Sequence, residues 1–322
     1  MRDARWNDKK RFFLSPWHRL AVNFYFCMKK LILFSTFALA LAASAAGIFA
    51  PDATLQKLAG GFAFTEGPTC NKKGDLFFVD QPNDRILKWS LPGKLTTFLQ
   101  PSGRANGMMF DAKGRLIACA DEHNELWSIS PRKKITVLVK NFGTNYFNGP
   151  NDVWIAPDGG LYFTDPFYRR KWWDHQMMAF TNEDVFHLTA DRKKITRVTE
   201  DLKKPNGITG TANGKNLFVS DIRDNKTWRY DLTADGSLTN KTFFCALGSD
   251  GMTIDTAGNL FLTGKGVTVF DRSGQQIDHL DVPEKWSANV CFGGADHKTL
   301  FITASESLYS IRTKFPGANA AK

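Results

Sequence analysis

The sequence predicts an all-β fold, a six-bladed β-propeller with four-stranded blades. Six segments of the 322-residue chain repeat one pattern: a short apolar strand, a turn, and a second strand that begins with leucine. The leading leucines are 40, 45, 56, 43 and 40 residues apart, a spacing typical of propeller blades. The second strands are expected at 76–80, 116–120, 161–165, 217–221, 260–264 and 300–304.

The other elements of each blade follow in order. Glycine lies in the turn before five of the second strands and accepts the positive φ of a tight hairpin. A third strand is expected at 85–89 and 227–230, and a fourth at 95–99. Four strands in about 40 to 45 residues make one blade. A β-sandwich is the alternative, but it does not need six near-equal hairpins, so we expect the propeller to fill residues 52 to 315.

Composition excludes two classes of protein. The chain is 43% hydrophobic and 13% aromatic, which is too apolar for a disordered chain. A multi-pass membrane protein is excluded because only one stretch, 31–50, is long and apolar enough to span a bilayer. The net charge of +10 suggests a polyanionic partner, but residues 1–45 hold eight basic and two acidic residues, or +6 of it. No nucleic-acid partner is therefore expected.

The N-terminal segment has the order of a secretory signal peptide. Met28, Lys29 and Lys30 precede an apolar run at 31–42 and a small-residue site that ends at Ala45. We expect translation to start at Met28, residues 1–27 to reflect a start assigned too early, 28–45 to be the signal peptide, and 46–322 to be the mature domain. That domain would be periplasmic or secreted, without stable membrane association. The alternative is an uncleaved anchor through 31–50.

Four cysteines remain in the mature chain: Cys70, Cys119, Cys245 and Cys291. An oxidising compartment permits one or two disulfides, whose pairing the sequence does not determine. Four buried thiols are the alternative, and the size of the domain favours it. No C-x-x-C spacing occurs, so a cysteine-bound zinc or redox site is not expected.

One polar residue recurs ten or eleven positions before each leading leucine. These residues should open the innermost strand of each blade and surround the mouth of the central channel. Their oxygens suit a hard divalent cation, Ca²⁺ first and then Mg²⁺ or Mn²⁺. The alternative is that the Asn-Gly and Asp-Gly pairs are ordinary turn dipeptides. The six residues, called the oxygen ring below, are Glu66, Asn106, Asn151, Asn206, Asp250 and Asn289.

Around the ring, the sequence resembles the gluconolactonase/regucalcin (senescence marker protein) family, in its bacterial secreted gluconolactonase-like branch. The matching motifs lie at 65–68, 105–107, 148–153, 161–166, 205–207, 250–252 and 291–294. The resemblance implies one catalytic metal held by Glu66, Asn151, Asn206 and Asp250, with Asn106 lining the substrate pocket. Zn²⁺ and Fe²⁺ join the candidate ions on this basis. The chain departs from the regucalcin branch at Gly149, where that branch has a sugar-binding arginine.

The expected reaction is metal-dependent hydrolysis of a sugar lactone or related ester. The metal would polarise the carbonyl, and Asp250, or otherwise Asp152, would activate water. The similar folds of diisopropylfluorophosphatase and paraoxonase leave aryl-ester or phosphotriester hydrolysis as an alternative. A non-catalytic exported sugar-binding or interaction propeller is another. Neither G-x-S-x-G nor H-E-x-x-H occurs, so serine hydrolase and zincin chemistry are not expected.

Three further residues are candidates for substrate binding. His123 follows a second strand and could face the channel mouth, or it could lie in an ordinary surface loop. Tyr168 and Trp172 belong to the longest spacing, whose aromatic side chains could stack on a sugar and whose cations could meet an acidic substrate. A solvated basic loop with its tryptophan packed against a neighbouring blade is the alternative there. The partner expected is a small-molecule lactone or ester, and the protein is expected to be a monomer or weak oligomer.

Overall fold

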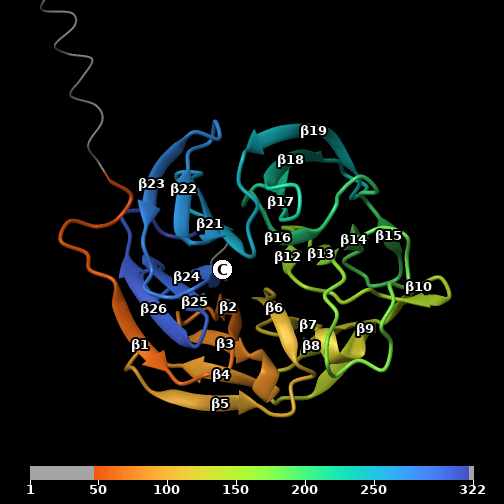
Figure 1. Cartoon of the computed structure of the whole chain (residues 1–322), viewed down its shortest axis with the longest axis horizontal. Helices are drawn as coiled ribbons and strands as arrows, with labels where there is room; N and C mark the ends of the chain where they lie inside the picture. Colours follow the sequence, from red (N-terminus) through yellow and green to blue (C-terminus); the bar gives the residue numbers. More distant parts are fainter. Residues whose placement is uncertain (1–46, 319–322) are drawn as a thin grey trace, which may run out of the picture. The chain divides into compact units, whose positions relative to one another are not determined.

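The computed structural model describes residues 47–318. Six four-stranded antiparallel sheets surround a central axis, which confirms the six-bladed propeller (Figure 1). The predicted signal peptide at 28–45 and the segment before it lie outside these residues, as does the alternative anchor at 31–50 apart from residues 47–50. Within 47–318 there is no helix long and apolar enough to cross a membrane.

Each blade runs from an inner strand at the channel to an outer edge strand, and the predicted second strands match the structure closely. Blade one consists of β2 (Thr65–Cys70), β3 (Leu76–Asp80), β4 (Arg85–Trp89) and β5 (Leu95–Leu99). Blade two consists of β6 (Ala105–Phe110), β7 (Leu116–Ala120), β8 (Glu125–Ile129) and β9 (Ile135–Val139). Blade three consists of β12 (Val153–Ile155), β13 (Leu161–Asp165), β14 (Asp184–Leu188) and β15 (Ile195–Arg197). Blades four and five are β16 (Pro205–Gly210), β17 (Asn216–Asp221), β18 (Lys226–Leu232) and β19 (Leu238–Cys245); and β20 (Met252–Ile254), β21 (Leu260–Gly264), β22 (Gly266–Phe270) and β23 (Gln276–Leu280).

Blade six joins the two ends of the propeller. It combines β24 (Ser287–Gly293), β25 (Thr299–Ala304) and β26 (Ser307–Arg312) with the first strand of the domain, β1 (Gln56–Gly60). β1 pairs antiparallel with β26, so the outer strand of the last blade comes from the start of the domain. The sequence repeat did not reveal this closure, because β1 lies outside the repeated unit.

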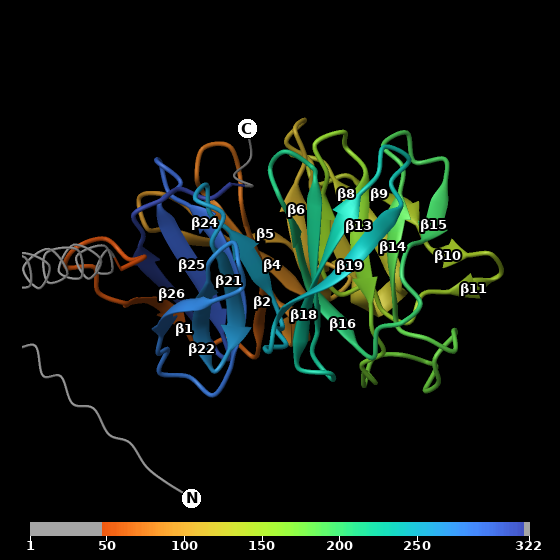
Figure 2. The same ribbon diagram turned by 90° about the horizontal axis from the view of Figure 1, so that it is seen from above.

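Four short elements complete the fold. The 3-10 turns η1 (Gln81–Asn83) and η2 (Asp121–His123) link second and third strands, and β10 (Asn141–Phe142) pairs with β11 (Asn145–Tyr146). This hairpin projects from the side of the propeller (Figure 2). The five predicted turn glycines all have positive φ, as expected: Gly74, Gly114, Gly159, Gly214 and Gly258.

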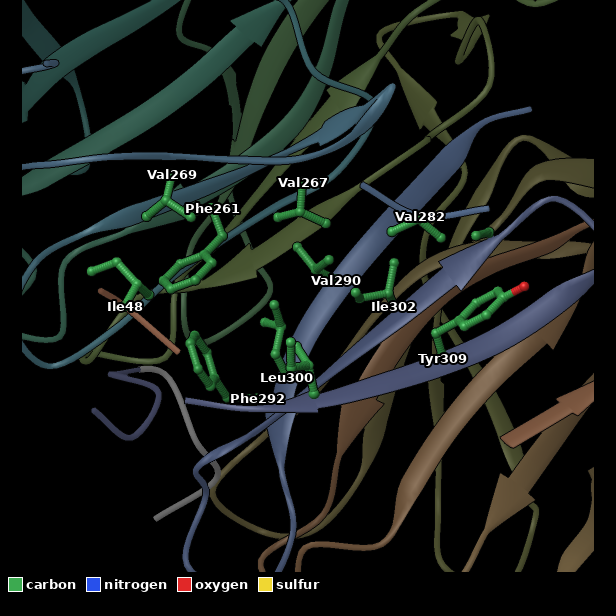
Figure 3. Close-up of a cluster of buried hydrophobic side chains, with 12 residues drawn as sticks. Ile48, Phe261, Val267, Val269, Val282, Val290, Phe292, Leu300, Ile302 and Tyr309 are labelled. Carbon is green, nitrogen blue, oxygen red and sulfur yellow. The ribbon is translucent and has the colours of Figure 1, made fainter. Parts of the chain in front are cut away.

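Apolar side chains fill the space between neighbouring blades. Figure 3 shows one such cluster, in which β21 and β22 face β24, β25 and β26. Ile48 joins it from the segment that precedes β1. The cluster includes Phe261, Val267, Val269, Val290, Phe292, Leu300, Ile302 and Tyr309. Burial of this kind between all blades holds the inner strands, and therefore the channel, in place.

The C-terminal segment covers the end of the channel opposite the oxygen ring. The backbone N–H of Thr256 donates to the carbonyl of Pro316, and the N–H of Ala318 donates to that of Ile254, both at 2.9 Å. Gly317 also lines a cavity of about 70 Å³ between the inner strands. The enclosed space between the inner strands is therefore small.

Candidate functional site

The structure places the oxygen ring at one end of the six inner strands. Glu66, Asn106, Asn206 and Asn289 lie in β2, β6, β16 and β24, while Asn151 and Asp250 come just before β12 and β20. All are buried except Asp250, which is partly exposed. The count back from each leading leucine therefore found six positions that do lie in register.

Bulges in the inner strands aim these side chains. In β2, β6, β16 and β24 the pairing register shifts at the ring residue or directly beside it, as between Glu66 and Thr69. A β-bulge leaves a residue out of the ladder and turns its side chain away from the regular pleat. The bulges explain why polar residues at strand positions point into the channel instead of into the apolar space between blades.

The glycines after the ring residues allow neighbouring inner strands to approach closely. A Cβ on Gly67 would lie 1.8 Å from the carbonyl oxygen of Asn106, and one on Gly107 would lie 2.5 Å from the Cα of Asp152. Asn106 and Gly107 lie inside β6, and Gly107 is not among the positive-φ glycines. The interpretation of such pairs as turn dipeptides is therefore wrong for this blade: the glycine is needed for space.

Asp250 lies in a network with two aromatic side chains. Its Oδ1 accepts a hydrogen bond from Nδ2 of Asn206 at 2.8 Å, and its Oδ2 accepts one from Nε1 of Trp286 at 2.6 Å. The same Asn206 amide donates to the hydroxyl of Tyr168 at 2.8 Å. Both carboxylate oxygens are thus held by N–H donors, and the amide of Asn206 is oriented with its oxygen free.

The pKa values of both ring carboxylates are raised. Burial, followed by the negative charge of Asp250, raises the pKa of Glu66 well above its usual value. Burial also raises the pKa of Asp250, although the Trp286 and Asn206 hydrogen bonds and the charge of Arg170 oppose this. The Oε2 of Glu66 accepts a hydrogen bond from the N–H of Gly67 at 2.9 Å, and the Asn289 side chain also interacts with this carboxylate.

The ring fits a bound divalent cation. The side-chain oxygens of Asn106 and Asn206 are buried and have no hydrogen-bond partner in the described structure. Such oxygens are costly unless something binds them. Two carboxylates beside orphaned amide oxygens form a hard-cation donor set. No three His, Cys, Asp or Glu side chains cluster as a metal site in residues 47–318, which is consistent with a donor set made largely of asparagines.

Asp152, the second candidate base, lies deeper in the channel. It is buried, its Oδ1 accepts a hydrogen bond from the N–H of Val153 at 2.9 Å, and it lines the inner cavity together with Asn289. Burial raises its pKa to about 7. Asp250 is partly exposed, whereas Asp152 lies beneath the ring, so a substrate at the mouth would reach Asp250 first.

The long connection between β13 and β14 brings the predicted loop residues to the rim. Nε1 of Trp172 donates to Oδ2 of Asp121 at 2.8 Å, and Nε1 of Trp173 donates to the carbonyl of the same aspartate at 2.7 Å. Arg170 lies 3.4 Å from the Asp121 carboxylate. These residues and Tyr168 form a group that we call the rim cluster: Asp121, Tyr168, Arg170, Trp172 and Trp173. The tryptophans of this loop thus pack onto blade two while Arg169 and Lys171 are exposed, which agrees with the alternative of a basic loop whose tryptophan packs against a neighbouring blade.

His123 does not join this cluster. It is exposed and stacks on the ring of Trp127, with 5.3 Å between ring centres. No hydrogen bond, ion pair or ring contact links it to the oxygen ring in the described part of the chain. The structure thus places His123 near blade two's surface, in line with the surface-loop alternative.

The structure adds Trp286, Asp121 and Arg170 to the predicted site. Trp286 contacts Asp250 from blade six, and Asp121 organises a loop from blade three. Both contacts join residues distant in sequence, so the repeat did not reveal them. The run of aromatic and basic residues around Arg170 was the one available signal. The four cysteines of the described chain are free thiols, and the sulfurs of Cys70 and Cys291 are 3.8 Å apart.

Fold and site together define a propeller protein with an oxygen-lined channel mouth. The chain belongs to the SMP-30/gluconolactonase/LRE-like family, whose model matches residues 64–306. It is 29% identical to the gluconolactonase of Zymomonas mobilis over 291 residues, 81% of each chain. These relationships place it in a family of enzymes and confirm the family predicted from the motifs.

Solved structures agree with this placement. A gluconolactonase from Xanthomonas campestris superposes with a TM-score of 0.78 at 27% identity, covering 85% of this chain and 93% of the other. Regucalcin from Agrobacterium tumefaciens, described as a calcium-binding protein, superposes with a TM-score of 0.68 at 18% identity, covering 83% and 95%. The second likeness supports the fold alone.

Proposed function

We propose that this protein is a lactonase that opens sugar-derived lactones with one divalent cation bound by Glu66, Asn151, Asn206 and Asp250. The observation that carries the proposal is the pair of carboxylates beside buried, unpartnered amide oxygens at the channel mouth. Family membership and the gluconolactonase relatives support the lactone as substrate. Ca²⁺ is the first candidate ion because every donor is an oxygen and the side chains are neutral amides as well as carboxylates.

The chain's own groups supply proton transfer and orientation. When bound, the cation supplies Lewis-acid polarisation of the carbonyl and offsets developing negative charge. Asp250 takes the proton from the attacking water. The N–H groups of Trp286 and Asn206 fix the carboxylate plane. Asp152 remains the second candidate base, acting from beneath the ring.

The variant Asp250→Asn tests this role. It should fold, bind Ca²⁺ more weakly in titration calorimetry, and lose about 10²-fold or more in kcat on any lactone substrate. Asp281→Asn is the matched control, because the Asp281 side chain is fully exposed, and it should keep both properties. Unchanged turnover in Asp250→Asn would remove Asp250 from the mechanism.

A substrate panel distinguishes the competing functions. Purified residues 46–322 with Ca²⁺ should acidify solutions of aldonolactones, and a chelator should abolish the effect. Turnover confined to aryl esters or phosphotriesters would replace the lactonase proposal with that class of hydrolase. No turnover of any ester, with Ca²⁺ bound, would favour a non-catalytic binding propeller.

We propose export as the location of this activity, on the basis of the pattern at residues 28–45. N-terminal sequencing of the protein recovered from its native host should begin near Ala46. Recovery of the full leader from the cell interior would contradict export.

A further inference from the structure

The rim cluster holds one guanidinium group beside the proposed catalytic site. The Cζ of Arg170 lies 5.4 Å from the centre of the Tyr168 ring and 5.5 Å from that of Trp172. Tyr168 contacts Asn206 of the oxygen ring through its hydroxyl. The Tyr168 side chain therefore contacts both Arg170 and Asn206, which is one of the proposed metal ligands.

The position of Arg170 is prepared by the fold. Asp121 is buried and receives three groups from the loop: the Arg170 guanidinium, the Trp172 indole and, at its backbone carbonyl, the Trp173 indole. The Cζ of Arg104 lies 4.8 Å from the Trp172 ring as well. A side chain held by stacking and by a buried carboxylate loses little conformational entropy when a ligand binds.

Asp121 occupies only one edge of this guanidinium. Nε of Arg170 contacts Oδ1 of Asp121 at 3.4 Å, and no hydrogen bond of the described chain engages Nη1 or Nη2. The Arg170 side chain is 21% exposed, so it is partly accessible at the rim. Two parallel N–H donors match the two oxygens of a carboxylate.

The charges near Tyr168 are balanced. Lys204 lies 4.3 Å from the Tyr168 ring, and both Lys204 and Arg223 pair with Glu183. The Asp250 carboxylate also acts on Tyr168, so the three cations Arg170, Lys204 and Arg223 stand beside the three carboxylates Asp121, Glu183 and Asp250. Recognition of an anion here therefore depends on the donors of Arg170 and not on a net positive field.

A side chain at residue 149 cannot bring a cationic group to this part of the mouth. A Cβ on Gly149 would lie 2.7 Å from the Trp173 ring, and its φ of 150° suits glycine. The loop that carries Arg170 thus fills the space in which a side chain at 149 would lie. A cationic group can reach this part of the mouth from the loop that carries Arg170, but not from the segment that precedes β12.

We propose that Arg170 binds a carboxylate of the substrate, so that the preferred substrate is a lactone with a second, free carboxylate, such as the monolactone of a sugar diacid. The inference rests on the proposed lactonase function and assigns its substrate class. Arg170 is then a specificity-determining residue, whereas Asp250 and the bound cation act on the lactone carbonyl.

The test compares a neutral and an acidic lactone of the same sugar, gluconolactone and glucarolactone. In Arg170→Gln, the ratio of kcat/KM for the acidic to the neutral lactone should fall at least about tenfold, mainly through a higher KM for the acidic lactone. In Arg170→Lys, this ratio should lie between those of the wild type and Arg170→Gln, since lysine keeps the charge but loses the paired donors. Arg169→Gln, one residue earlier and exposed, is the matched control and should leave the ratio unchanged.

A binding measurement separates this inference from the proposed function. Calorimetry of Ca²⁺-loaded protein with glucarate, the open dicarboxylate, should show binding that Arg170→Gln weakens and that added salt weakens in the wild type. An equal loss for both lactones, or glucarate binding that is identical in the two proteins, would overturn the inference. Absence of lactone turnover with intact, Arg170-dependent glucarate binding would refute the lactonase and keep the anion site.

Discussion

Close approach of backbones accounts for the glycines that follow four ring residues. Gly67, Gly107, Gly207 and Gly251 each meet the inner strand of the next blade. At Gly251 a Cβ would lie 2.0 Å from the side-chain carbon of Asn289, which is itself a ring residue. Each glycine therefore brings one ring residue close to the next, and the ring geometry depends on the absence of side chains.

Gly107→Ala should test this dependence. The added Cβ would lie 2.6 Å from the carbonyl oxygen of Asn151, so the neighbouring backbone must shift. We expect a loss of about 1–3 kcal/mol in the free energy of unfolding, together with weaker Ca²⁺ binding. Denaturant titration and calorimetry measure the two effects. Gly60→Ala is the control, because its Cβ meets side chains alone, the flexible end of Lys57 at 3.1 Å and the Oγ of Ser307 at 3.4 Å. Equal stability and Ca²⁺ affinity in both variants would contradict the packing argument.

At the residue scale, the sequence predicted the oxygen ring and missed its supports. Glu66 and Asn289 could be found because the repeat places them at a fixed distance from a leucine. Trp286 could not, since its contact with Asp250 crosses from blade six to blade five. A repeat reports what recurs within each blade, and these supports occur once.

The β13–β14 pair places two buried carboxylates opposite each other. Asp165 and Asp184 are direct partners in the register. Asp165 accepts hydrogen bonds from the N–H groups of Asn148 at 2.9 Å and Gly149 at 2.8 Å, which holds the segment before Asn151. Burial raises the pKa of Asp165 to about 7 and that of Asp184 to about 6. These two strands should therefore make stability depend on pH.

The sign follows from proton binding. Both folded-state pKa values exceed those of an unfolded aspartate, so the folded state holds more protons between about pH 4 and 7. The free energy of unfolding should fall as pH rises through this window, by at most about 7 kcal/mol for the two groups together, and then level off. Glu183 adds to the effect on both groups, while Arg197, 3.2 Å from Asp184, opposes it.

Asp165→Asn should flatten this profile. It removes one titrating group and the repulsion that Asp184 feels, although it also leaves one of the two N–H groups poorly paired. Denaturant unfolding between pH 4 and 8 should show a lower absolute stability and a smaller slope. Asp52→Asn is exposed and should keep the wild-type slope. A slope in Asp165→Asn as steep as in the wild type would show that other groups cause the dependence.

The same pair of strands shows what spacing predicts at the scale of elements. The 56-residue interval correctly located a long connection, because extra residues in a repeat must leave the blade. The sequence did not determine the conformation of this connection, because the contacts of Trp172 and Trp173 with Asp121 join blade three to blade two. The length of the connection could be predicted from its own sequence, whereas its packing depends on residues of another blade.

Closure of the whole propeller depends on a seam between blade one and blade six. β1 crosses it by pairing with β26 at the outer side. At the inner side, Cys70 of β2 and Cys291 of β24 face each other across the seam, with 3.8 Å between their sulfurs. A Cβ on Gly293 would lie 2.1 Å from the sulfur of Cys70, so glycine makes room for this thiol.

A covalent link at this seam should stabilise the entire ring. Thiol–disulfide exchange with oxidised glutathione would join the two sulfurs and release two molecules of glutathione, with only a small shift of the inner strands needed. The link closes a loop with a sequence separation of 221, which in the chain-entropy model adds at most about 5 kcal/mol to the free energy of unfolding. Non-reducing mass spectrometry should find the 70–291 link, and thermal unfolding should shift upward. Cys70→Ser should lose the shift, while Cys245→Ser, on the outer strand of blade four, should keep it. Opening the propeller at this seam exposes the apolar faces of blades one and six together. If the oxidised protein unfolds at the same temperature as the reduced one, unfolding begins at another blade interface.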